Sequence, residues 1–206
     1  MKITNTEVYG ISSAIRGMRN PMSSHSKSDT VGDVIGVEDL KLAKKLILAG
    51  AEHGKFLRQI HVWADINTTR YIWGEVDTYK YNTKNSESTI HKLFNLDCEL
   101  TLDKFYTDDM SDGDLKFLGT IVDYLNTIRQ DWVDSGRKFE HVRRAKRLLP
   151  ETFLQMRTLD TNYAELRNIY FQRRHHRLRA EWGVIIEWIE SLPYAKELIT
   201  IERKAD

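Results

Sequence analysis

The sequence has one cysteine, Cys98, and three prolines among its 206 residues. A single cysteine excludes a framework of disulfide bonds within the chain and is typical of a reducing compartment, so we expect a cytoplasmic protein. So few prolines argue against long disordered linkers. No apolar run reaches the roughly 18 residues that a membrane-spanning helix needs, and the first residues form no apolar signal core, so we expect no membrane partner.

Motifs for metals and for common cofactor folds are also missing. The sequence contains no Cys-x-x-Cys, His-x-x-x-His or His-Glu-x-x-His pattern, so we expect no metal site. It has neither a Gly-x-Gly-x-x-Gly turn nor a phosphate-binding loop, so any dinucleotide would have to bind without a Rossmann-type dinucleotide-binding motif. No nucleophile elbow occurs, and catalytic residues therefore stay unassigned.

Composition places the chain among ordinary globular proteins. Apolar residues make up 41% and charged residues 30%, and the length suits one domain, so we expect a single domain over 1–206. The net charge is only +1, so the whole molecule is not a general binder of polyanions. Affinity for a nucleotide or a nucleic acid must therefore be local.

Hydrophobic periodicity predicts an α+β fold in which a mixed sheet packs against long helices. The clearest helix carries a one-sided apolar stripe and begins at a capping box formed by Ser111 and Asp114. Polar loops are expected at 20–35 and 82–89. Strands are expected at 2–11 and 56–66, and helices at 37–51, 69–80, 102–106, 114–133, 139–149, 160–182 and 184–191.

The predicted helix 160–182 is the most informative segment. Asn162 and Arg173 are eleven residues apart, close to three turns, so they would face the same way about 16 Å apart. An amide and a guanidinium so placed suit a long ligand with a polar ring and a phosphate, because arginine donates two parallel charge-assisted hydrogen bonds. Two alternatives remain for the basic run 173–179, namely a solvated helix face and, less expected, a nucleic-acid contact.

A second polar segment, 78–90, reads Thr-Tyr-Lys-Tyr-Asn-Thr-Lys-Asn-Ser-Glu-Ser-Thr-Ile. It supplies many hydrogen-bonding groups, although a solvated turn is the commoner outcome of such a composition. Farther along, Leu-Leu-Pro ends at Pro150, and asparagines follow at 162 and 168 before Arg173.

Together these segments resemble the flavin-dependent thymidylate synthases, which carry the signature Arg-His-Arg-x-x-Ser-x-Asn-x-x-Ser-x-Arg. Asn85 and Ser88 match this signature outright, Thr83 and Lys80 match it in kind, and the family's C-terminal pattern falls on 146–173 without a gap. The resemblance implies an α+β fold that binds FAD and a pyrimidine deoxynucleotide such as dUMP. The implied FAD contacts are Lys80, Thr83, Asn85, Asn162 and Asn168, and the implied nucleotide contacts are Ser88, Lys146, Arg147 and Arg173.

The resemblance also implies a homotetramer with shared active sites and reductive methylation at pyrimidine C5. Reduced flavin would deliver the hydride and methylenetetrahydrofolate the carbon, with NADPH as a candidate electron donor. The chain is similar as well to a divergent group of phage and bacterial relatives of these enzymes.

The chain departs from the signature at its ends, where Thr78-Tyr79-Lys80 replaces Arg-His-Arg and Ile90 replaces the last arginine. Three hypotheses follow. Another basic side chain compensates, or the substrate differs, or the protein binds nucleotides without catalysis. The candidates for compensation are Arg58, Arg70, His91 and Arg177.

Overall fold

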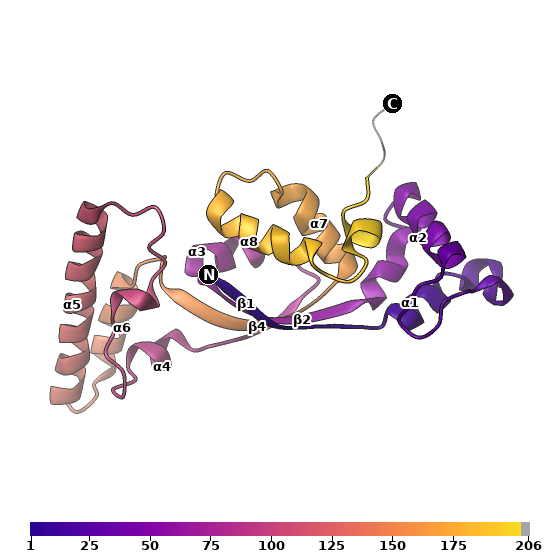
Figure 1. Cartoon of the computed structure of the whole chain (residues 1–206). Coiled ribbons are helices and arrows are strands. Elements are labelled where there is room, and N and C mark those ends of the chain that lie inside the picture. The colour runs from indigo at the N-terminus through magenta and orange to yellow at the C-terminus, as the bar shows by residue number, and fades with distance from the viewer. Residues whose placement is uncertain (203–206) are drawn as a thin grey trace. The chain divides into compact units, whose positions relative to one another are not determined.

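The computed structural model describes residues 1–202, and Figure 1 labels most of its helices and strands. The strands are β1 (Lys2–Tyr9), β2 (His61–Thr69), β3 (Thr83–Ser86) and β4 (Leu154–Asn162). The α-helices are α1 (Ile11–Gly17), α2 (Val37–Ala49), α3 (Arg70–Val76), α4 (Thr89–Leu93), α5 (Asp112–Asp134), α6 (Phe139–Leu148), α7 (Tyr163–Arg173) and α8 (Arg179–Glu190). Short 3-10 turns include η3 (Gly54–Gln59), and a π turn, η5, spans Ala195–Ile199. The predicted α+β class is confirmed.

The four strands form one sheet in the order β1-β2-β4-β3. Thr158 Oγ1 donates to Asp65 Oδ1 at 2.6 Å, and Tyr163 N donates to Ile60 O at 3.0 Å. As one residue number rises by five, its partner's falls by five, so β2 and β4 are antiparallel. β1, which falls within the strand predicted at 2–11, lies at one edge of the sheet.

The chain divides into two compact units; four of the five boundaries fall within β1, β2, β3 and β4, and the fifth, at 78/79, lies between α3 and β3. Unit 1 consists of 1–2, 66–78 and 85–157, and unit 2 consists of 3–65, 79–84 and the chain from 158 onward. Each unit is described by itself below. The expectation of one domain over the whole chain stays a prediction.

The core of unit 1 is built on α5. The predicted capping box is present, because Ser111 Oγ accepts from Asp114 N and the Asp114 carboxylate accepts from Ser111 N. The helix packs against α6, as its apolar stripe requires. The buried residues of this core are Leu93, Phe94, Leu100, Phe105, Leu118, Val122, Leu125, Ile128, Val142, Ala145, Leu149 and Phe153.

Unit 2 holds its N-terminal loop through a buried carboxylate. Asp39, in α2, is fully buried and pairs with Arg19, whose side chain is 5% exposed. Asp39 Oδ2 also accepts from Ser28 Oγ at 2.7 Å and from Thr30 Oγ1 at 2.6 Å. Burial alone would raise the pKa of Asp39, but the hydrogen bonds from Thr30, Ser28 and Arg19 lower it to about 2. The loop predicted at 20–35 is therefore tied to a helix.

The predicted helix 160–182 is wrong. Residues 154–162 form a strand, and the following helices α7 and α8 are separated by a turn at 174–178. Pairing of β4 between two other strands overrides the local helical preference of its residues. A continuous helix would also place like charges of the run 173–179 three and four residues apart, which is unfavourable.

Two shorter predictions also need correction. The strand expected at 56–66 begins only at His61, because the preceding residues form η3, which buries Phe56 and Leu57. The turn expected at 82–89 contains β3, which pairs with β4. The predicted helices at 37–51 and 139–149 are confirmed with slightly shorter bounds. The helix predicted at 69–80 is confined to Arg70–Val76, and 102–106 is a brief 3-10 turn at Leu102–Lys104.

Candidate functional site

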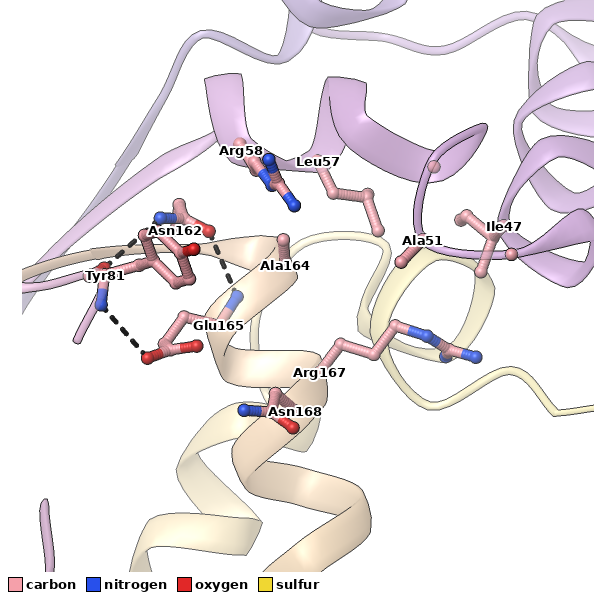
Figure 2. A pocket seen from close by; sticks show the side chains of 12 residues that line it. Ile47, Ala51, Leu57, Arg58, Tyr81, Asn162, Ala164, Glu165, Arg167 and Asn168 are labelled. Carbon is pink, nitrogen blue, oxygen red and sulfur yellow. Dashed lines mark hydrogen bonds between the residues drawn. The ribbon is translucent and has the colours of Figure 1, made fainter. Parts of the chain in front are cut away.

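A cavity of about 400 Å³ in unit 2 lies at the start of α7, beside α2 and η3 (Figure 2). We call it the asparagine cavity, because Asn162 and Asn168 both line it. Its other lining includes the apolar side chains Ile47, Leu57 and Ala164. It therefore offers an apolar wall beside polar groups, as sites for small ligands commonly do.

The polar corner of this cavity is held rigidly. Asn162 caps α7 by accepting from Glu165 N at 3.0 Å, and its Nδ2 donates to Tyr81 O at 3.3 Å. Glu165 Oε1 in turn accepts from Tyr81 N at 3.2 Å. Dashed lines in Figure 2 mark these hydrogen bonds among Tyr81, Asn162 and Glu165. Because Asn162 and Glu165 are less than a tenth exposed, the segment at Tyr81 is fixed to the first turn of α7.

Two arginines line the asparagine cavity, and they have different roles. Arg167 donates to the carbonyls of Ile199 and Ile201, and its burial lowers the pKa of Arg167. Arg58 is exposed, with its guanidinium 5.7 Å from the centre of the Tyr81 ring. Among residues 1–202, no carboxylate pairs with Arg58. Arg58 is therefore the cation of this cavity that an anionic ligand can use.

A chain of hydrogen bonds runs along the exposed side of α7. Asn168 Oδ1 accepts from Gln172 Nε2 at 2.8 Å, and Gln172 Oε1 accepts from the Tyr79 hydroxyl at 3.1 Å. The same hydroxyl accepts from Arg173 Nε at 2.8 Å. Tyr79, which replaces the histidine of the family signature, is 6% exposed and thus orients Arg173.

Arg173 lines a second hollow, which has a volume of about 420 Å³ and lies at the turn between α7 and α8. We call it the basic hollow; its basic lining is Arg173, Arg174, His175, His176 and Arg179. The Arg173 guanidinium lies 4.8 Å from the centre of the Trp182 ring and 5.7 Å from that of Tyr79. Such cation–π contacts hold the guanidinium in a defined place.

Part of the basic charge of the run 173–179 is compensated within the chain. Arg174 makes a two-pronged ion pair with Glu202, at 3.1 and 3.2 Å. The hydrogen bond to Glu202 is also the main cause of the raised pKa of Arg174. Arg174 is thus committed to a carboxylate of its own chain.

Asn162 and Arg173 were predicted to lie on one face of one helix and to contact the two ends of a long ligand. The structure does not place them in this way. Asn162 belongs to the strand and caps the helix, whereas Arg173 is the last residue of that helix, and they line different hollows. Asn162 and Asn168 are brought together at the asparagine cavity. Lys80 and Thr83 share with Asn162 a shallower hollow of about 300 Å³.

The remaining predicted residues lie in unit 1. Ser88 caps α4 by accepting from His91 N at 3.3 Å. Lys146 donates to Thr89 Oγ1, and burial, followed by the nearby charge of Arg70, lowers the pKa of Lys146. Glu151, which pairs with Arg70 at 3.1 Å, lies in the same corner and acts in the opposite direction on the pKa of Lys146. Asn85, in β3, and Arg147, in α6, are exposed.

Several contributors were missed by sequence reasoning. Glu165 ties the polar corner together, Tyr79 orients Arg173, and Trp182 packs against its guanidinium. One signal was available, because Asn162 followed three residues later by Glu165 is typical of a helix start. The approach of Trp182 to Arg173 depends on the turn between two helices, which periodicity did not reveal.

Within the described part of the chain, no group of three His, Cys, Asp or Glu side chains could hold a metal ion. None of the helices of residues 1–202 combines the length and apolarity needed to cross a membrane.

No protein-family model and no curated protein matches this sequence. Two crystal structures of flavin-dependent thymidylate synthase X from Helicobacter pylori, both with FAD and dUMP, are similar in fold. Their TM-scores are 0.73 and 0.74 and their identities 18% and 17%, and each comparison covers 97% of this chain and 98% of the other. The chain thus has the fold of a flavin-dependent thymidylate synthase.

Proposed function

We propose that this protein binds FAD and a pyrimidine deoxynucleotide, dUMP or a close analogue, as a divergent flavin-dependent thymidylate synthase-like protein. The observation that carries the proposal is the asparagine cavity, in which the fixed Tyr81–Asn162–Glu165 corner faces an apolar wall beside the exposed guanidinium of Arg58. The shared fold supports it, because both Helicobacter pylori structures contain these two ligands.

The cavity residues fit a flavin. Ile47 and Leu57 offer an apolar surface for a flat ring, Asn168 offers an exposed amide for its polar edge, and Arg58 offers a charge for a phosphate. The full set that we propose to contact FAD is Lys80, Thr83, Asn85, Asn162 and Asn168. When bound, reduced flavin would supply a hydride, and the chain's own residues bind and orient the reactants.

For the nucleotide we propose Arg173 as the main phosphate contact. Tyr79 fixes the Arg173 guanidinium through a 2.8 Å hydrogen bond, so little side-chain entropy is lost when an anion binds. Ser88, Lys146 and Arg147 are proposed as further contacts. We also propose a homotetramer in which more than one copy contributes to each site, and a cytoplasmic location.

The proposed reaction is reductive methylation at pyrimidine C5, with methylenetetrahydrofolate as carbon donor and NADPH as electron donor. The competing function is nucleotide binding without turnover. It is favoured by one feature, the replacement of two signature arginines by Thr78 and Ile90. Losing one partner of a buried charge-assisted contact commonly costs about 2–5 kcal/mol, which is enough to suppress a reaction.

The test combines binding with turnover. Calorimetric titration with dUMP should show saturable binding that Arg173→Ala weakens, and the complete mixture of FAD, dUMP, folate and NADPH should yield thymidylate. Binding without thymidylate would support the non-catalytic alternative. Absence of binding by both FAD and dUMP would reject the proposal. Binding of single-stranded DNA, reduced equally by each arginine substitution in 173–179, would support the nucleic-acid alternative.

A further inference from the structure

We propose that the basic hollow selects a ligand with a chain of phosphates, a nucleoside di- or triphosphate in preference to a monophosphate. This inference rests on the proposed nucleotide binding and names the form of the nucleotide. The first observation is the density of basic groups, since six of the seven residues 173–179 are arginine or histidine. Five of these six line the hollow, and Arg177 does not.

The arginines of the hollow are not equivalent. Arg174 is committed to Glu202, and Arg173 is held between Tyr79 and Trp182. Arg179 is exposed, and within residues 1–202 no carboxylate pairs with it. A monophosphate would meet one guanidinium, that of Arg173, which already has partners within the chain. A second guanidinium lining the same hollow is what a longer phosphate chain would use.

The start of α8 adds to the positive potential. Arg179 is its first residue, and no side chain caps this 12-residue helix. The N-terminus of a helix carries partial positive charge and favours anions. Among the residues lining the hollow, the acidic one is Glu187, two turns further along and about 12 Å from the helix start. Glu181, in the first turn of α8, is buried and has a partner within the chain, so it offsets part of the positive potential there. The cationic groups are therefore concentrated at the turn between the helices.

The hollow is also suitable in shape and rigidity. Its volume of about 420 Å³ is within the usual range for small-ligand sites. His176 Nδ1 accepts from Leu178 N at 3.2 Å, and the His176 ring lies edge-on to Trp182 at 6.0 Å between centroids. The turn is thus ordered by contacts within the chain, so a bound phosphate chain would meet prepositioned donors.

The experiment is calorimetric titration of the full-length protein with dUMP, dUTP and inorganic tripolyphosphate, without divalent cations. We expect dUTP to bind at least about tenfold more tightly than dUMP, as one added charged hydrogen bond would give. Arg179→Ala should remove this preference, and the matched control Arg177→Ala should retain it. A thermal melt of each variant checks that both fold.

Three results would overturn the inference. The first is equal affinity for dUMP and dUTP, and the second is an affinity for dUTP that Arg179→Ala does not change. The third is an equal loss of dUTP affinity in Arg177→Ala and Arg179→Ala, which would indicate a diffuse surface potential. If dUMP binds with no preference for dUTP, the proposed function stands and this inference fails. If tripolyphosphate binds through Arg179 and neither dUMP nor FAD binds, the basic hollow stands and the proposed function fails.

Discussion

Arg173 and Arg174 are neighbours in sequence, yet the structure gives them different roles. The Arg173 guanidinium is oriented by Tyr79 and Trp182 toward the basic hollow, whereas the Arg174 guanidinium is paired with Glu202. Neighbouring helix positions point about 100° apart, which allows this division. The basic run is therefore a set of individually placed groups.

This difference predicts unequal effects of two substitutions on dUMP binding. Arg173→Ala should weaken binding by about 2–4 kcal/mol, because it removes a charge-assisted contact. Arg174→Ala should change binding by less than about 1 kcal/mol, since it breaks a partly exposed ion pair within the chain. Calorimetry on both variants measures this. Small and equal effects would show that the run is only a charged surface.

Asp39 predicts the acid sensitivity of unit 2. Its pKa is lowered from 3.8 to about 2, so its contribution to stability is present above about pH 4 and is lost as the pH falls toward 2. The shift corresponds to about 2 kcal/mol. Urea midpoints of the wild type should fall across this window. In Thr30→Val, which removes one hydrogen bond to Asp39 and so raises its folded pKa, the fall should be smaller and should end at a higher pH. Identical pH profiles for the two proteins would contradict this account.

At the scale of elements, the sequence predicted what local chemistry determines. The capping box at Ser111 and the apolar stripe of α5 follow from side-chain spacing, and both are present. The strand β4 was missed because its pairing partners are distant in sequence, and long-range pairing overrode a helical pattern. The break between α7 and α8 was missed because neither proline nor glycine marks it.

Asn162 joins two elements, which predicts a larger stability loss than an ordinary helix cap gives. Ser111→Ala, the matched control at the exposed start of α5, should cost about 1 kcal/mol. Asn162→Ala should cost about 2 kcal/mol or more, because the residue is 9% exposed and also holds Tyr81 O. Urea unfolding measures both variants. Equal losses would mean that the tie to Tyr81 contributes nothing.

At the scale of the whole molecule, the α+β class and the identity of several polar groups could be predicted, but their grouping could not. Asn162 and Asn168 share one cavity, whereas Arg173 lines another. Ser88 and Lys146 lie in unit 1. Such grouping depends on tertiary packing, which residue spacing along the chain does not encode.

The proposed assembly gives a direct prediction at this scale. Light scattering at micromolar concentration should give four times the 24.2 kDa mass of one chain. The physical reason is that a site completed by several copies would make assembly and ligand binding mutually favourable. A monomer mass, unchanged by FAD and dUMP, would refute the tetramer and leave the cavities of a single chain as the whole site.

The central claim is that the asparagine cavity binds a flavin, and the visible spectrum tests it most directly. After incubation with FAD and gel filtration, the wild type should keep a band near about 450 nm, where bound oxidised flavin absorbs. Arg58→Ala should retain much less of this band, because it removes the exposed cation of the cavity. The exposed control Arg16→Ala should match the wild type. A colourless wild type, or equal retention by all three proteins, would contradict the account.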